Sequence, residues 1–248
     1  MSRVLIEVAC TNMVSVRAAI ESGADRIELC AALGVGGITP SDGFIREALE
    51  KSSVPVFVMI RPREGDFLYS SEELEIMLKD VAMCRSAGVP GIVTGMLTKD
   101  GEIDKEKAKR IMEAAGDMSV TFHRAFDLSA DAMQSLSDLV GLGFHRLLTS
   151  GMAASAPVGA DCIRELVVKS DGKITVMAGA GVRPDNVASL VRSTGVREVH
   201  LSGKVMMKSG MSFRRDHLAM GTPDTDDYLL PVTDAAIIRA LRKELDAL

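Results

Sequence analysis

The chain lacks the features that mark membrane, secreted and nucleic-acid-binding proteins. No apolar run approaches the roughly 20 residues of a membrane-spanning helix, and Glu7 stands where a signal peptide needs an apolar core. Asp and Glu number 34 against 29 Lys and Arg, so the net charge of −5 offers no basic excess for a nucleic acid. We therefore expect no membrane partner, no nucleic-acid partner and a cytoplasmic location.

Cysteines and linkers are also scarce. The four cysteines, at positions 10, 30, 84 and 162, are widely spaced, which favours free thiols over a disulfide framework. No Pro/Gly/Ser-rich stretch or block of charge divides the sequence, so we expect residues 1–248 to form a single domain. Its 248 residues suit a (β/α)8 barrel, which typically needs about 250. Hydrophobic residues at 47% and charged residues at 25% exclude a disordered chain.

What the sequence does contain is a repeated strand signal. Short apolar runs recur about every 28 residues. Several follow a glycine that can end a helix, as in Gly23-Ala-Asp-Arg-Ile-Glu-Leu and Gly195-Val-Arg-Glu-Val-His-Leu. The eight predicted strands are Val4–Val8, Arg26–Leu29, Pro55–Ile60, Gly91–Thr94, Ser119–Phe122, Arg146–Thr149, Ile174–Ala178 and Glu198–Leu201.

Segments with helical spacing lie between these strands. Leu74, Met77, Leu78 and Val81 fall at i, i+3, i+4 and i+7, and Ser71 is the predicted N-cap of that helix. Ser129 is a candidate cap for the helix that follows it, and Thr233 for a closing helix that runs to Leu248. Strand–helix alternation over the whole chain predicts an α/β protein, a TIM (β/α)8 barrel with a C-terminal closing helix. An open doubly wound sheet would need a Gly-rich turn after the first strand, which this chain lacks.

Ionisable residues stand at the predicted carboxyl ends of the strands, where barrels of this kind hold their chemistry. Charged groups crowded at one rim are costly unless they pair with one another or bind a ligand. They form either a structural ion-pair network or a site for a polar ligand, and we favour the ligand site. The candidate acid/base residues are Glu7, Glu28, His123, Asp127 and His200. His145 precedes its strand, and we expect a structural role for it at the opposite end of the barrel.

A second set of rim residues suits an anion. Arginine side chains offer fork-shaped donors to carboxylate or phosphate. The Gly179-Ala-Gly181 turn and the turn after the eighth strand lie where barrel enzymes commonly hold phosphate. The candidate anion-binding residues are Arg61, Arg63, Arg124, Ser150, Gly179, Gly181 and Ser202.

Metal binding is limited by the same pattern. The sequence has no CxxC or HxxxH spacing, which argues against zinc. A soft Cu(I) site needs two thiolates, or a thiolate and a thioether. Cys10 and Cys30 lie on adjacent strand ends and can supply it if the backbone turns at Cys10. We expect Cys84 and Cys162 to be packing residues on helices.

Motifs along nearly the whole chain resemble the CutC family of copper homeostasis proteins. The resemblance implies a cytoplasmic TIM barrel, commonly oligomeric, that binds Cu(I) through cysteines matching Cys30 and a position near the end of the first strand. That second position is Ala9 in this chain, and the thiol comes one residue later at Cys10. The matching motifs are Glu7, Gly23-Ala-Asp-Arg-Ile-Glu-Leu-Cys30, Gly36-Gly-Ile-Thr-Pro40, Met59-Ile-Arg-Pro-Arg63, Gly65-Asp-Phe-Leu-Tyr-Ser70, Val120-Thr-Phe-His-Arg-Ala-Phe-Asp127, Leu148-Thr-Ser-Gly151, Ala178-Gly-Ala-Gly181, Glu198-Val-His200, Ser209-Gly-Met-Ser-Phe-Arg214 and Ala219-Met-Gly221.

Three functions follow as expectations. The resemblance implies a copper homeostasis protein with a copper (Cu+) ion as its ligand, assembled as a homo-oligomer. The rim residues favour a TIM-barrel enzyme that performs acid/base chemistry on a small anionic ligand, phosphorylated or sugar-like. A scaffold protein with a vestigial site is the third reading, in which rim substitutions would change nothing.

Overall fold

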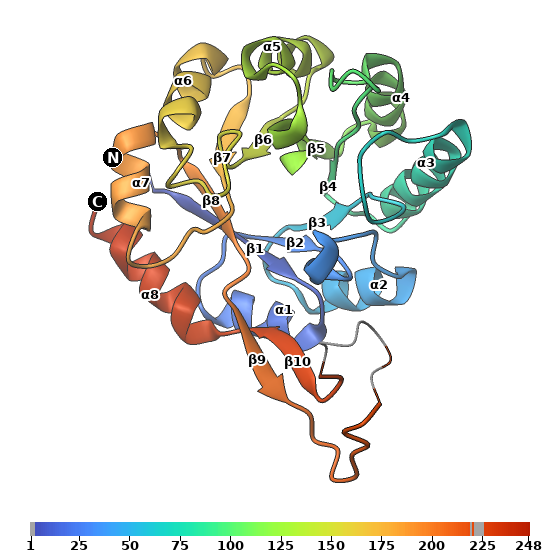
Figure 1. Cartoon of the computed structure of the whole chain (residues 1–248), viewed down its shortest axis with the longest axis vertical. Helices are drawn as coiled ribbons and strands as arrows, with labels where there is room; N and C mark the ends of the chain where they lie inside the picture. Colours follow the sequence, from blue (N-terminus) through green and yellow to red (C-terminus); the bar gives the residue numbers. More distant parts are fainter. Residues whose placement is uncertain (1–2, 219, 221–225) are drawn as a thin grey trace.

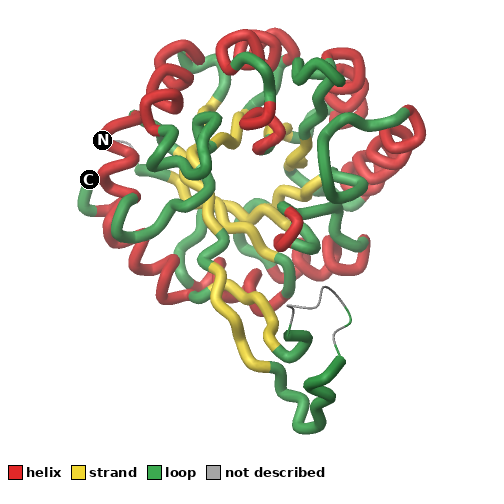
Figure 2. The backbone as a smooth tube through the Cα atoms, viewed as in Figure 1, coloured by secondary structure: helices red, strands yellow, loops and turns green. Residues whose placement is uncertain are grey.

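A computed structural model describes residues 3–218, 220 and 226–248 of the chain. Eight parallel strands close into a barrel in sequential order, and β8 pairs with β1 to complete it (Figures 1 and 2). The predicted TIM-barrel fold is confirmed. The strands are β1 (Leu5–Cys10), β2 (Arg26–Leu29), β3 (Val56–Met59), β4 (Gly91–Thr94), β5 (Ser119–Phe122), β6 (Arg146–Thr149), β7 (Thr175–Ala178) and β8 (Glu198–Leu201).

The strand predictions hold because each strand is a short run with apolar residues that the barrel buries along nearly its whole length. β2, β4, β5, β6 and β8 have the predicted bounds, whereas β3 and β7 are shorter. The predicted bounds of β1 were wrong. The strand begins at Leu5 and continues through Cys10, two residues past the predicted end at Val8. The backbone therefore does not turn at Cys10, because Cys10 still pairs with Leu29 of β2.

Helices surround the barrel and bury one face each against it (Figure 1). Short 3-10 helices follow β2 and β5, namely η1 (Leu33–Val35) and η2 (Arg124–Leu128). Their position at the carboxyl ends of two strands places both beside the mouth of the barrel. The α-helices are α1 (Met13–Glu21), α2 (Asp42–Lys51), α3 (Ser71–Ser86), α4 (Lys105–Ala115), α5 (Ala132–Leu142), α6 (Ala160–Ser170), α7 (Val187–Thr194) and the predicted closing helix α8 (Ala235–Asp246).

Three predicted helix caps were wrong by one or two residues. Ser70, not Ser71, caps α3 and forms a capping box with Glu73. Asp131 caps α5 in place of Ser129, and Asp234 caps α8 in place of Thr233, which ends a strand. A neighbouring Ser or Asp offered an equally suitable side chain in each case, so residue type alone did not fix the boundary.

Charged residues, not only apolar ones, fill part of the barrel interior. Arg26 lies between Glu7, 2.5 Å from its Nε, and Glu198, and Arg146 binds the same Glu198 at 3.0 Å. Both guanidinium groups stack on the ring of Phe57, at 5.0 and 5.2 Å. Every charge in this layer has an opposite charge beside it, as burial requires.

A two-stranded arm extends away from the barrel (Figures 1 and 2). It consists of β9 (Lys204–Lys208) and β10 (Leu229–Thr233), which pair antiparallel, and β9 is exposed along its whole length. This arm was not predicted from the sequence. Within the Ala219-Met-Gly221 motif, positions 219 and 221 lie outside the described residues. No helix in the described part of the chain has the length and hydropathy needed to cross a membrane.

Candidate functional site

A cavity of about 1020 Å³ opens at the carboxyl ends of the strands. Its walls come from the ends of the barrel strands, from η1 and η2, and from the turns after β7 and β8. Eight of the predicted site residues line this cavity together, although they come from segments far apart in the sequence. They are Glu28, Arg61, His123, Arg124, Asp127, Gly181, His200 and Ser202.

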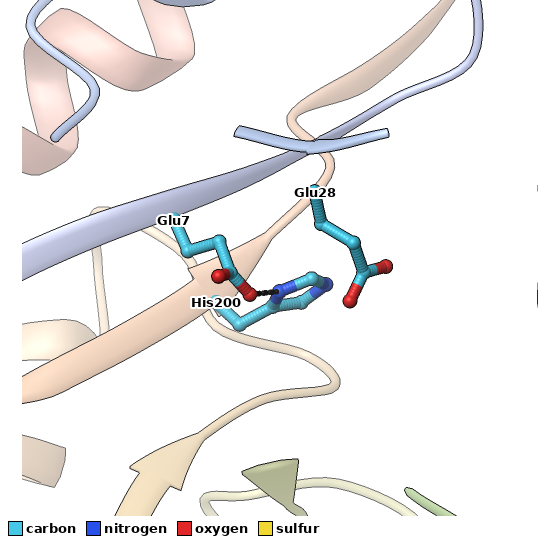
Figure 3. Close-up of side chains that lie close together, drawn as sticks. All are labelled: Glu7, Glu28 and His200. Carbon is cyan, nitrogen blue, oxygen red and sulfur yellow. Dashed lines mark hydrogen bonds and ion pairs between the residues drawn. The ribbon is translucent and has the colours of Figure 1, made fainter. Parts of the chain in front are cut away.

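Glu7, His200 and Glu28 form one cluster on the neighbouring strands β8, β1 and β2 (Figure 3). His200 Nδ1 lies 2.8 Å from Glu7 Oε1, and Arg26 donates to the other carboxylate oxygen of Glu7. The Glu28 carboxyl lies on the side of the His200 ring that faces away from Glu7. One carboxylate oxygen of each glutamate and one ring nitrogen of His200 all lie within 4.8 Å of one another. Glu7 thus orients the imidazole and leaves its Nε2 for Glu28 or a ligand.

The environments of the two glutamates drive their pKa values apart. Burial by itself would raise the pKa of Glu7, but the charge of Arg26 and the hydrogen bond with His200 lower it to about 2. Burial raises the pKa of Glu28 to about 7, against a weaker opposing effect of His200. The two carboxylates raise the pKa of His200 above its usual value although its burial lowers it. Glu7 is therefore a fixed anion, whereas Glu28 can gain or lose a proton near neutral pH.

His123 enters the cavity from the end of β5 as the N-cap of η2. Its Nδ1 accepts a hydrogen bond from the Ala125 backbone N–H at 3.2 Å, which places the ring proton on Nε2. That Nε2 is buried and has no hydrogen-bond partner within the described residues. Burial and the nearby charge of Arg61 lower the pKa of His123 to about 3, so the ring stays neutral.

Glycine at position 95 makes room for this imidazole. A Cβ there would lie 2.5 Å from Nδ1 and 2.6 Å from Cε1 of His123. The Phe67 ring packs against the imidazole from another direction, with the ring centroids 5.0 Å apart. Neither Gly95 nor Phe67 was predicted as a site residue, since neither carries a titratable group.

Arg61 is a buried cation without a carboxylate partner in the described part of the chain. Its terminal nitrogens donate to the backbone carbonyls of Val35, Gly37 and Gly65, each at 2.8 Å. Its Nε, also buried, has no partner among the described residues. Carbonyl dipoles hold the guanidinium in place without neutralising its charge, so the cavity wall keeps a fixed positive group.

Arg63, Arg124 and Asp127 instead find partners within the protein. Arg63 is turned toward Glu73 and Asp66 in the loop after β3, and it does not line the cavity. Arg124 binds Asp127 at 2.7 Å and donates to Ser150 Oγ at 3.0 Å. Asp127 also accepts from the Thr149 hydroxyl and the Ser150 backbone, which fastens η2 to the end of β6. These contacts hold the wall that carries His123.

The predicted glycine turn serves packing and backbone shape. A Cβ at Gly179 would lie 2.5 Å from Leu148 Cδ1 and 3.3 Å from His200 Cβ, so glycine there lets His200 pack close. Gly181 has φ +73°, and both Gly181 and Ser202 line the cavity.

The structure places the two candidate copper ligands in different layers. Cys10 packs in the core between the barrel and its helices. Cys30 packs in an inner cluster with Phe57, Met59 and Val93. All four cysteines are free, and burial raises the pKa of Cys10 to about 12 and that of Cys30 further. Neither thiol lines the cavity.

Glu7, Glu28 and His200 are the group with metal-ligand spacing within the described residues. Both oxygens of Glu7 are already engaged by Arg26 and His200. Only Glu28 and the Nε2 of His200 remain as donors, so this set does not fit a resident cation. Arg26, which sequence reasoning missed, decides this point; its signal was its place two residues before Glu28, on the same strand face.

The fold and the cavity define a TIM barrel with a polar site at the carboxyl ends of its strands. The chain belongs to the CutC family, whose model matches residues 4–205. A CutC family protein of Vibrio vulnificus is 48% identical over 236 residues, 94% of each chain. A CutC protein of Streptococcus agalactiae that is named for copper homeostasis has a solved structure 34% identical, with a TM-score of 0.76 over 79% of this chain and 97% of that one. Phosphoribosylanthranilate isomerase from Thermotoga maritima, 16% identical with a TM-score of 0.57 over 99% of this chain and 100% of that one, shares the fold.

Proposed function

We propose that this protein is an enzyme that performs acid/base chemistry on a small anionic substrate in the mouth of the barrel. One observation carries the proposal. Glu28, Arg61 and His123 line one cavity, and each keeps a buried polar atom that has no partner within the described residues. Each such atom costs about 1–3 kcal/mol, and a bound ligand would offset that cost.

Each residue has a role that its surroundings support. Arg61 supplies the charge that holds the anionic group, since its own contacts are with neutral carbonyls. Glu28 moves the proton, because its pKa near 7 lets it serve as acid or base. His200 stands beside Glu28 in the orientation that Glu7 imposes.

Anion binding can be tested by calorimetric titration of the purified protein with inorganic phosphate and with malonate. We expect Arg61→Met to weaken binding at least about tenfold, the effect of losing one charged hydrogen-bonding group. Arg110→Met removes an exposed arginine paired with Glu75 and is the matched control. Equal affinity in wild type and Arg61→Met would contradict the anion site. If Arg61→Met does not fold, Arg61→Lys takes its place in the titration. Lysine keeps the positive charge but loses the fork-shaped pair of donors, so we expect it to weaken binding as well.

Turnover can be tested with a mixture of small phosphorylated and carboxylated metabolites, followed by mass spectrometry. We expect a change with the wild type that Glu28→Gln abolishes. An unchanged mixture, despite Arg61-dependent anion binding, would leave a binding protein and contradict the enzyme.

A second candidate function is copper homeostasis through Cu(I) binding at Cys30. The family relative named for copper homeostasis supports it, and so does the presence of Met59 in the same inner cluster as Cys30. A thiolate and a thioether are both soft ligands that suit Cu(I). A Cβ at Gly37 would lie 3.4 Å from Cys30 Sγ and 3.5 Å from Met59 Cε, so both side chains border the same glycine.

The copper proposal is tested by titrating Cu(I) against a competing chelator. We expect Cys30→Ser and Met59→Leu to weaken binding, and Cys10→Ser, in the other layer, to have a smaller effect. Cys84→Ser, which changes a buried thiol on α3, is the control. Equal affinity in wild type and Cys30→Ser would remove the site.

We propose a cytoplasmic location and a homo-oligomer as the setting for either function. The four free cysteines suit a reducing compartment. The arm supports self-association, since Val205, Met207 and Leu230 are exposed on one face of it.

A further inference from the structure

We propose, on the basis of the acid/base function above, that the reaction is an enolisation. The substrate class is a small α-hydroxy carbonyl compound that carries a phosphate or carboxylate group. The juxtaposition that points to this reaction is a fixed neutral N–H at His123, a carboxyl at Glu28 and an uncompensated cation at Arg61, all lining one cavity. Proton abstraction beside a carbonyl needs a base and a donor to the developing oxyanion, which Glu28 and His123 supply, and Arg61 holds the anionic group of the substrate.

His123 is fixed as a neutral donor by its surroundings. The Ala125 N–H occupies Nδ1, so Nε2 carries the proton, and Nε2 has no acceptor among the described residues. Gly95 and Phe67 leave the ring little freedom to move. A neutral imidazole N–H polarises the substrate carbonyl in an isomerase of the same fold, where an imidazolium would be a worse match for the enolate. The low pKa of His123 agrees with this role.

Glu28 lies on the other side of the mouth from His123. Glu28 lies in β2, one residue before its end, whereas His123 follows β5, so β3 and β4 separate them around the eight-stranded barrel. Its Oε2 is buried without a partner in the described structure. A substrate between the two residues would present its C–H to the carboxylate and its carbonyl oxygen to the imidazole.

Arg61 selects the substrate's charge. It leaves the end of β3, between the strands that carry the other two groups, and its guanidinium stacks 4.9 Å from the centroid of the Phe67 ring that also packs on His123. The anion therefore binds close to the carbonyl donor. A cavity of about 1020 Å³ holds a small molecule of this kind with room for water.

The step balances without a co-reactant. The Glu28 carboxylate removes a proton from the carbon beside the carbonyl, and that C–H electron pair forms the C=C bond of an enediolate. The carbonyl π pair moves onto the oxygen, which accepts the hydrogen bond from His123 Nε2. Return of the proton from Glu28 to the same carbon restores the substrate. Return to the former carbonyl carbon gives the isomer, provided that His123 gives its Nε2 proton to the enediolate oxygen and takes up the proton of the neighbouring hydroxyl, which becomes the new carbonyl.

Proton exchange in deuterium oxide tests the inference directly. Proton NMR would follow loss of the C–H signal from dihydroxyacetone phosphate, hydroxypyruvate and neutral dihydroxyacetone. We expect the wild type to exchange the C–H protons of at least one of the two anionic probes, dihydroxyacetone phosphate or hydroxypyruvate. It should exchange those of neutral dihydroxyacetone far more slowly. Glu28→Gln should slow exchange by about 100-fold or more, the usual contribution of a catalytic base. His123→Gln should slow it by about 100-fold, the effect of losing one donor to an oxyanion.

His145→Gln is the matched control. His145 also accepts a backbone N–H at Nδ1, from Val120, but it precedes β6 at the far end of the barrel. Exchange equal to buffer for both anionic probes, in a wild type that still binds phosphate through Arg61, would overturn the enolisation and leave the anion site standing. Absence of both phosphate binding and exchange would overturn the two proposals together. The wild-type measurement decides even if a variant fails to fold.

Discussion

Glu28 has a buried carboxyl group whose ionisation opposes folding. Its pKa rises from the usual 4.5 to about 7 in the folded chain, chiefly through burial. A carboxyl with a raised folded pKa contributes stability below pH 4.5 that is lost as the pH rises through about 7. The fold thus gives up stability to keep this group at the cavity.

Glu28→Gln should therefore stabilise the protein under alkaline conditions. We expect a gain of about 1–3 kcal/mol near pH 8 and little change near pH 5, since glutamine resembles the protonated carboxyl. Urea denaturation at both pH values measures it. Glu47→Gln, on the exposed face of α2, is the control. A loss of stability at pH 8 would mean that Glu28 is a structural ion-pair partner.

The pKa values of the two cavity histidines should be shifted in opposite directions from the ordinary 6.5. The pKa of His123 falls to about 3 through burial and the charge of Arg61, whereas nearby carboxylates raise that of His200 above 6.5. Nitrogen-15 NMR of the imidazoles should show His123 as a single neutral tautomer from about pH 5 to 8, while His200 carries charge at the lower end. A His123 that titrates near pH 6.5 would contradict its role as a neutral donor.

At this scale the sequence predicted which ionisable residues meet, but not their partners. Glu28, His123 and His200 could be placed because strand order fixes where each strand ends. Arg63 and Arg124 carry the same guanidinium as Arg61, yet Glu73 and Asp127 engage them. Nothing in residue type separates a paired arginine from an unpaired one, since that depends on loop geometry.

The secondary-structure elements were predictable where a strong periodic signal had no competitor. β2 and β4 were found at their bounds because each follows a helix-ending glycine by a few residues and carries buried aliphatic residues, Ile27 and Leu29 in β2 and Ile92 and Val93 in β4. β9 was not predicted because all of its residues are exposed, so no alternation of buried and exposed positions marks it as a strand. The predicted N-caps of α3, α5 and α8 were displaced by one or two residues because each lies close to a second residue that caps equally well.

The start of α3 offers a test of that last point. Ser70 accepts from the Glu73 N–H while Glu73 reaches back to the Ser70 N–H. Ser70→Ala should cost about 1 kcal/mol of stability in thermal or urea unfolding, the usual effect of losing an N-cap. Ser71→Ala, one residue into the helix, should change it by less than about 0.5 kcal/mol. Equal costs would show that the capping box does not form.

At the scale of the whole molecule, the closed barrel could be predicted from the repeat of strands and helices in the sequence. Association between copies of the chain could not be predicted in this way. Surface-facing apolar residues on a strand look the same in sequence whether they cover a barrel or a neighbouring chain. The exposed face formed by Val205, Met207 and Leu230 became visible only in the structure.

The proposed assembly should depend on this face. Met207 and Leu230 stand opposite each other in the register of the arm, at 39% and 42% exposure. The pair Met207→Lys and Leu230→Lys should convert an oligomeric wild type into monomer, because two charges would be buried at the contact. Sedimentation velocity measures the mass. Ile76→Lys, exposed to 49% on α3, is the control. An unchanged mass in the double variant would place the contact elsewhere.

Position 95 bears on how variants of this protein should be interpreted. Glycine there has no side chain to meet a ligand, yet even alanine would displace the His123 ring from its seat. In a saturation mutagenesis survey, almost every substitution of Gly95 would abolish function, and the loss would be interpreted as a folding defect. If Gly95→Ala is soluble and melts at the wild-type temperature but has lost activity, then Gly95 serves the reaction and not the fold. Its contribution is the space that it leaves for the His123 ring.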